Sequence, residues 1–181
     1  MKITAFLLLL FIASTSFSQF EVNYNTIGSL KLGASVSEVS KLCGQPLTFE
    51  AGDFSVEFDI AISGTPYHIW FQEDEGEDKV KTMKLNRVSI KDPKFKTKEG
   101  AKVGMTKAEV LNLYKDFYSF EMTRYLDPET FDYPTNKLMF IIDKKDNQAI
   151  FDFEDFTEYR ILFLIIDNVV KEIHIVDGYI I

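Results

Sequence analysis

The sequence predicts an α+β fold made of two tandem repeats, each a short capped helix followed by about four antiparallel strands. Two observations predict this fold. A twelve-residue segment, KLGASVSEVSKL at residues 31–42, recurs as KVGMTKAEVLNL at residues 102–113 with five identities. Segments with alternating apolar and polar residues follow each copy, as in strands with one buried face; one match among them aligns residues 80–85 with 170–175. We assign residues 19–97 to the first repeat and residues 98–181 to the second.

The first 18 residues have the features of a secretory signal peptide. Lys2 precedes an apolar run at residues 3–13, and Ser16 and Ser18 occupy the −3 and −1 positions of a cleavage site before Gln19. The apolar run is shorter than the roughly 20 residues that span a bilayer. The sequence therefore predicts an exported protein, secreted or periplasmic, that is soluble and has no membrane span after cleavage.

The composition narrows the classes of function. With 46% hydrophobic residues, the chain is expected to fold around a core rather than stay disordered. A formal charge of −8 opposes binding to the phosphate backbone, so we expect no nucleic-acid partner. A single cysteine excludes an internal disulfide and a cysteine-rich zinc site, and two histidines remain as imidazole ligands. We therefore expect no cofactor and no metal.

Each copy of the repeated segment is expected to begin a helix. A serine or threonine stands three residues before a glutamate, the spacing of a capping box that satisfies free amide groups at a helix N-terminus. A glycine two residues before each cap gives freedom to the preceding turn. The residues of this structural motif are Gly33, Ser35, Glu38, Gly104, Thr106 and Glu109. We interpret the two glutamates as caps rather than as paired catalytic acids, because capping already accounts for their spacing.

The first helix should span residues 36–43 and stop at Gly44, and the second should run from Lys107 to about Phe117. Strands are expected at residues 54–62, 67–72 and 80–90 in the first repeat, with an acidic hairpin loop at 73–78. In the second repeat they are expected at residues 120–126, 138–143, 149–154, 159–166 and 169–176, with an inserted loop at 126–136. The acidic loop lacks the ligand order of an EF-hand, so we interpret it as a solvated loop, with calcium binding as the alternative.

The first copy of the motif carries a family resemblance. Gly33-Ala34-Ser35-Val36-Ser37-Glu38-Val39, followed by Leu42, Gly44 and Pro46, resembles the G-M-[ST]-x-x-[EQ]-V-x-x-L-x-G-x-P signature of small bacterial envelope domains. These are the SmpA/OmlA domain and the related β-lactamase-inhibitory-protein fold, in which two units in tandem form a concave sheet surface that grips another protein. The second copy lacks the final Gly-x-Pro. The resemblance implies a binding module.

The candidate binding residues lie on the predicted strands of both repeats. The run at residues 161–166 is apolar on both strand faces and needs a cover, which could be the other repeat, the inserted loop or a partner. We expect burial within the chain, because large exposed apolar patches are uncommon on monomers, and Leu162 and Leu164 would be binding anchors if the run were exposed. Tryptophan and arginine often dominate the binding energy of protein interfaces. On these grounds the candidate residues of a binding sheet face are His68, Trp70, Arg160, Leu162, Leu164 and His174.

A catalytic or metal-binding role is the alternative for the two histidines. His68 and His174, with Glu57 and Asp59, could supply a general base or metal ligands. No nucleophile, third ligand or base stands at a recognisable spacing. We therefore interpret the histidines as polar residues of the sheet surface, and we expect no catalytic residue.

The sequence thus predicts an exported, non-enzymatic binding module that holds a protein or peptide of the cell envelope on its sheet face. The alternative is a structural or assembly accessory of the envelope without a discrete ligand. The third possibility is an unrecognised hydrolase or metal-dependent enzyme.

Overall fold

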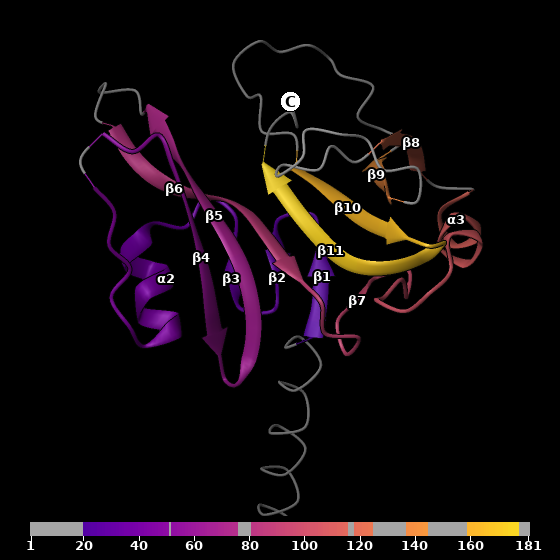
Figure 1. Ribbon diagram of the computed structural model, residues 1–181, viewed down its shortest axis with the longest axis horizontal. Helices are drawn as coiled ribbons and strands as arrows, with labels where there is room; N and C mark the ends of the chain where they lie inside the picture. Colours follow the sequence, from indigo (N-terminus) through magenta and orange to yellow (C-terminus); the bar gives the residue numbers. More distant parts are fainter. Residues whose placement is uncertain are drawn as a thin grey trace, which may run out of the picture.

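The computed structural model describes residues 20–50, 52–75, 81–115, 118–124, 137–144 and 159–177 (Figure 1). These residues form an α+β fold with a four-stranded sheet, a seven-stranded sheet and two helices. The predicted signal peptide at residues 1–18, the inserted loop at 126–136 and the strand expected at 149–154 lie outside the described residues. In the part of the chain that is described, no helix is long and apolar enough to cross a membrane.

The seven-stranded sheet is antiparallel at every pairing, in the order β4-β5-β6-β11-β10-β9-β8. Its strands are β4 Ser55–Ile62, β5 Thr65–Glu75, β6 Lys81–Ile90, β8 Tyr118–Arg124, β9 Lys137–Lys144, β10 Tyr159–Ile166 and β11 Val169–Asp177. Two series of neighbouring strands, β4 to β6 and β8 to β11, meet where β6 pairs with β11 (Figure 1). The prediction of a strand at residues 159–166 is confirmed at both ends.

A second sheet, which the sequence analysis did not predict, has the order β3-β2-β1-β7. Its strands are β1 Glu21–Asn23, β2 Thr26–Ile27, β3 Leu30–Lys31 and β7 Lys96–Thr97. Strands of two or three residues are too short to show an alternating pattern. β7 pairs in parallel with β1, so this sheet ties the start of the described chain to residues that follow β6.

Both helices begin where the capping boxes predict. α2 spans Val36–Cys43 and α3 spans Lys107–Tyr114. In each box the cap hydroxyl accepts the glutamate N–H, and the glutamate carboxylate accepts the N–H of the cap residue at 2.7 Å. These hydrogen bonds favour the ionised carboxylates, so the pKa values of Glu38 and Glu109 lie below the usual value.

The two helices end differently. α2 stops at Gly44, whose φ of 70° is a left-handed conformation that glycine adopts without strain. The predicted extension of α3 to about Phe117 is wrong, because the helix ends at Tyr114. Tyr114 is fully buried and donates its hydroxyl to Thr97 Oγ1 at 2.6 Å, which fixes the end of α3 against the core beside β7.

One face of the seven-stranded sheet forms the main hydrophobic core. Its buried residues on β5, β6 and β11 include Tyr67, Ile69, Phe71, Leu85, Val88, Ile90, Ile173 and Ile175. The same cluster contains Val39 of α2, Val110 and Tyr114 of α3, and Val22, Ile27 and Leu30 of the small sheet. Both helices and the four-stranded sheet therefore pack against this face, which we call the inner face. The opposite side of the seven-stranded sheet is the outer face.

The acidic segment at residues 73–78 is only partly a loop. β5 continues to Glu75, so Glu73 lies opposite Met83 and Asp74 lies opposite Thr82 on β6. The loop prediction is wrong for residues 73–75. The alternation of apolar and polar side chains along β5 ends before these residues, but the backbone pairing with β6 continues to Glu75. Residues 76–78 lie outside the described residues.

The segment before each helix makes the same backbone contacts with a strand of the large sheet. The bonds are Gly33 N–H to Leu85 O (2.8 Å), Leu85 N–H to Ala34 O (2.8 Å), Gly104 N–H to Val170 O (2.9 Å) and Val170 N–H to Met105 O (2.8 Å). Leu85 of β6 and Val170 of β11 thus have the same role. The predicted match of Leu85 with Ile175 is wrong, because alternating strands resemble each other at several offsets.

Replacing Ser35 with alanine should lower the free energy of unfolding by about 1 kcal/mol, because the Glu38 N–H loses its capping hydroxyl. Urea denaturation of the wild type and the variant measures the change. Ser37→Ala is the matched control, since Ser37 is exposed on the first turn of the same helix and no capping bond involves it. Equal losses in the two variants would contradict a capping role for Ser35.

Candidate functional site

The six candidate binding residues lie on the outer face, in neighbouring rows of cross-strand pairs. One row consists of Asp59, His68, Ser89, His174 and Leu162, on β4, β5, β6, β11 and β10 respectively. The next row consists of Glu57, Trp70, Arg87, Val176 and Arg160 on the same strands. Leu164 lies opposite Glu172 in a third row. The structure thus brings candidates from both halves of the chain onto one surface.

The exposure of this surface changes from one end to the other. On β4 and β5, the side chains of Glu57, Asp59 and His68 are 49%, 91% and 42% exposed. On β10, Leu162 and Leu164 are buried and form a second hydrophobic cluster with Val176 of β11. Leu162 and Leu164 are buried, as expected for a run that is apolar on both strand faces, so the condition for their role as binding anchors is not met. The accessible part of the outer face lies on the first strands.

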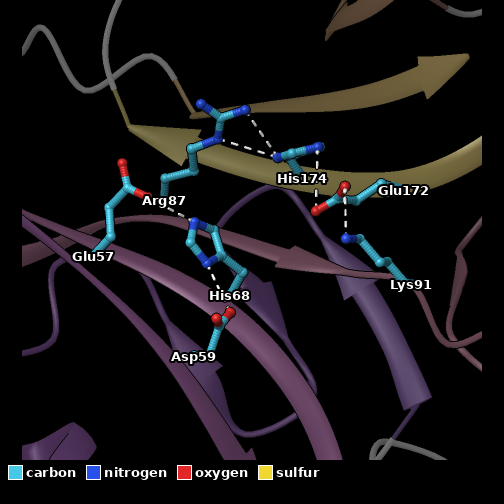
Figure 2. Close-up of polar contacts among 7 residues, drawn as sticks. All are labelled: Glu57, Asp59, His68, Arg87, Lys91, Glu172 and His174. Atoms are coloured by element: carbon cyan, nitrogen blue, oxygen red, sulfur yellow. Dashed lines mark hydrogen bonds and ion pairs between the residues drawn. The ribbon is translucent and has the colours of Figure 1, made fainter. Parts of the chain in front are cut away.

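His68 is held between two carboxylates of the edge strand β4. Its Nε2 lies 3.0 Å from Glu57 Oε2, and its Nδ1 lies 2.9 Å from Asp59 Oδ1 (Figure 2). The strand register sets this geometry, because Asp59 lies directly opposite His68 and Glu57 lies two residues away on the same face. An imidazolium has an N–H on each nitrogen, so the protonated ring can donate to both carboxylates at once.

His174 has very different surroundings. The ring is buried, and its Nδ1 accepts hydrogen bonds from Arg87 Nε at 3.1 Å and from a second guanidinium nitrogen at 3.0 Å (Figure 2). Because a guanidinium has donors and no acceptor, the proton of the neutral imidazole lies on Nε2. Burial, and next the charge of Arg87, hold the pKa of His174 well below its usual value.

Glu172 and Lys91 extend this buried network. His174 Nε2 lies 3.8 Å from Glu172 Oε1, and Lys91 Nζ lies 3.8 Å from Glu172 Oε2. Both distances are too long for hydrogen bonds, so the contacts are electrostatic. Glu172 is buried while the Lys91 side chain is exposed, so the ammonium group compensates the carboxylate from the edge of the network.

Three buried polar atoms of the outer face have no hydrogen-bond partner among the described residues. They are Trp70 Nε1, Ser89 Oγ and His174 Nε2. A buried donor without a partner costs roughly 1–3 kcal/mol. Side chains that stability alone would not favour are concentrated at functional sites, so this cluster marks the outer face as a candidate site.

The arrangement does not suit a metal ion or a serine nucleophile. Within the described ranges, no group of three or more His, Cys, Asp or Glu side chains is placed to hold a metal. Ser89 lies opposite His174, but the Arg87 bonds leave the ring proton on Nε2. Nε2 therefore has no lone pair with which to accept a proton from the Ser89 hydroxyl.

Sequence reasoning assigned the six candidates to one sheet face, and the strand register places them together on the outer face. It missed the polar residues next to them. Arg87 and Ser89 alternate with Val88 and Ile90 on β6, and Lys91 directly follows the strand, a signal that was present in the sequence. The interpretation of His174 as a sheet-surface residue is wrong, because His174 is only 5% exposed. Alternation indicates which face a residue lies on, and it does not indicate whether that face is covered.

Comparison with known proteins gives no match: no family model, curated protein or solved structure matches this chain. The resemblance to the SmpA/OmlA domain and the inhibitory-protein fold therefore stays a prediction.

The stability of the protein should fall with acidification below pH 6.5, because His174 must stay neutral in the folded state. Its folded pKa is lowered by burial, then by Arg87, His68 and Lys91, while the unfolded chain regains a value near 6.5. Below that pH the unfolded state binds a proton that the folded state does not bind. Between pH 7.5 and 5.5 this group should therefore remove about 1.4 kcal/mol from the free energy of unfolding.

Urea denaturation at the two pH values tests this dependence on His174→Gln, which cannot be protonated. The variant should lose about 1.4 kcal/mol less than the wild type over the same interval, whatever its stability at pH 7.5. His68→Gln is the control: it removes a partly exposed histidine and one of the smaller causes of the low pKa of His174, while burial and Arg87, the two largest causes, stay in place. An unchanged acid dependence in His174→Gln would show that the buried ring is not the group responsible.

Proposed function

We propose that this chain is an exported, non-enzymatic binding module that holds a protein or peptide partner on the outer face of β4, β5 and β6. One observation carries the proposal. This part of the outer face presents Trp70 together with the ordered cluster of His68, Glu57 and Asp59, while the helices and the small sheet pack on the inner face. Side chains held on paired strands lose little conformational entropy when a partner binds.

The chemistry of this surface suits a polypeptide partner. Trp70 offers part of a large apolar ring, the type of side chain that most often dominates interface energies, while its indole N–H is buried in the sheet surface. Glu57 and Asp59 flank it with partly exposed charges, which guide approach and fix the orientation of a partner more than they add affinity. The contact surface is smaller than the sequence predicts, since Leu162, Leu164 and His174 are buried.

We also propose that the two halves are tandem repeats related by a two-fold rotation. If Leu85 corresponds to Val170, then Val88 corresponds to Ile173 and Ile90 corresponds to Ile175. In the pairing of β6 with β11, Ile90 lies opposite Ile173 and Val88 lies opposite Ile175. A two-fold rotation about an axis through the pair of Ser89 and His174 exchanges these two pairs. This local symmetry supports the proposal that the two halves are repeats. The resemblance implies the same tandem arrangement and the same use of a shared sheet surface.

Export with cleavage before Gln19 would keep the first described strand, β1, in the mature chain. Phe20 is partly buried against the core, and its ring meets Phe95 edge-on with centroids 5.3 Å apart. β1 begins at the next residue, Glu21. Cleavage before Gln19 would thus leave every described core residue in the mature chain, which we place in the cell envelope or outside the cell.

A photo-crosslinking amino acid tests the binding surface. Placed at Gln72, which is exposed on the outer side of β5, it should capture one stoichiometric partner from the envelope fraction of the source cells. The same probe at Lys41, exposed on α2, is the matched control and should capture none. Trp70→Ala should reduce the affinity for the purified partner by more than about tenfold, as a central interface tryptophan does.

Equal capture from Gln72 and Lys41, or an affinity unchanged by Trp70→Ala in a folded variant, would refute binding on the outer face. No stable partner, together with loss of envelope integrity when the protein is deleted, would favour the accessory role without a discrete ligand. Circular dichroism and urea denaturation establish that each variant is folded before binding is compared.

A further inference from the structure

A groove of about 440 Å³ opens between the amino end of α2, the segment before β4 and the ends of β5 and β6. The side chains that line the groove include three apolar and three acidic ones: Val36, Phe49 and Met83, and Glu50, Asp53 and Glu73. Glu73 and Met83 lie opposite each other on β5 and β6. The volume is within the range of about 300–1,000 Å³ that is usual for ligand sites. The groove adjoins the helix α2, so it is separate from the outer-face surface proposed above.

Apolar groups line one part of this groove. Val36 is the first residue of α2, and Met83 of β6 is a buried lining residue of the groove. Phe49 exposes 45% of its surface. Phe54 lies next to the groove, where its carbonyl accepts the Glu73 N–H at 2.8 Å, and it exposes 72% of its surface. Phe49 and Phe54, five residues apart in sequence, thus expose apolar side chains at and beside the groove that another molecule could cover.

Carboxylates line the other part of the groove. Glu50, Asp53 and Glu73 come from two different segments, so three negative charges meet around one cavity. Among the described residues, neither Glu50 nor Asp53 has an ion pair with a lysine or an arginine. Asp53 also accepts the backbone N–H of Glu50 at 2.9 Å, which orders this segment with its charges directed together.

The amino end of α2 does not offset this negative potential. Its partial positive charge is already engaged by the capping box, in which the Glu38 carboxylate accepts both the N–H and the hydroxyl of Ser35 at 2.7 Å. A ligand with an apolar stem and a positive head would match both parts of the groove. Lysine and arginine side chains have this structure.

We propose that this groove binds a lysine or arginine side chain of a partner polypeptide. The aliphatic stem lies against Val36 and Met83, the cationic head meets Glu50, Asp53 and Glu73, and Phe49 covers the head with its aromatic face. This site does not depend on the outer-face surface, because none of its lining residues belongs to the cross-strand rows described above.

The test is a titration of the ¹⁵N-labelled protein at low ionic strength with the peptide acetyl-Gly-Lys-Leu-Lys-Gly-amide. Amide resonances of Phe49, Glu50, Asp53 and Met83 should shift with a single saturating dissociation constant. The same peptide with both lysines Nε-acetylated keeps the stems and loses the charges, so it should bind at least about tenfold more weakly.

Variants of the protein locate the site. Glu50→Gln combined with Glu73→Gln should weaken binding of the lysine peptide by about tenfold. Phe49→Ala should weaken it by about threefold through loss of the aromatic face. Asp53 is left intact because it orders the backbone of the segment. Glu21→Gln is the control: it removes a carboxylate on β1 that does not line the groove, so it should leave the affinity unchanged.

Three results would overturn the proposal. Equal binding of the acetylated peptide would make the groove a site for apolar groups without charge recognition. Equal weakening by Glu21→Gln would show non-specific attraction to an acidic protein. Shifts confined to residues outside the groove would place the peptide elsewhere. Loss of binding here would leave the outer-face partner untouched, because that partner is assayed through Gln72 and Trp70.

Discussion

The antiparallel pairing of β6 with β11 is the constraint on which the rest of the structure depends. It runs from Arg87 opposite Val176 to Ile90 opposite Ile173, and it joins the strands before α3 to those after it in one sheet. Without it, β6 and β11 would both be edge strands with unpaired backbone groups. With it, Val39 of α2 and Val110 of α3 belong to one hydrophobic cluster on a continuous inner face.

The same pairing forces a polar network into the seam between the halves. Since Val88 and Ile90 face the core, Arg87 and Ser89 must face outward, and they meet His174 of β11 there. A buried imidazolium beside a guanidinium would be strongly unfavourable. The ring is therefore neutral, and its Nδ1 accepts hydrogen bonds from the Arg87 guanidinium. A shift of one residue would turn these polar groups into the core, so the network opposes any other register.

The sequence predicted those parts of the fold that depend on local chemistry. The starts of α2 and α3 follow from capping boxes of four residues, and the bounds of β10 follow from a run that is apolar on both faces. The small sheet was missed because β1 and β7 are held by pairing across more than 70 residues, which leaves no local pattern. For the candidate site, alternation gave the face of His68 and Trp70, but the register that brings Arg87 to His174 exists only in the folded sheet.

The two ends of the outer face differ in the exposure of their side chains, and therefore in what they contribute to stability. Along one row of pairs, an exposed aspartate is followed by a partly exposed histidine, a buried serine, a buried histidine and a buried leucine: Asp59, His68, Ser89, His174 and Leu162. The leucine end contributes burial, and with it stability. The aspartate end contributes little, because exposed ion pairs are weak. A sheet selected for stability alone has no need for ordered, accessible charges beside a tryptophan, and for this reason we propose the first strands as the part of the outer face that binds a partner.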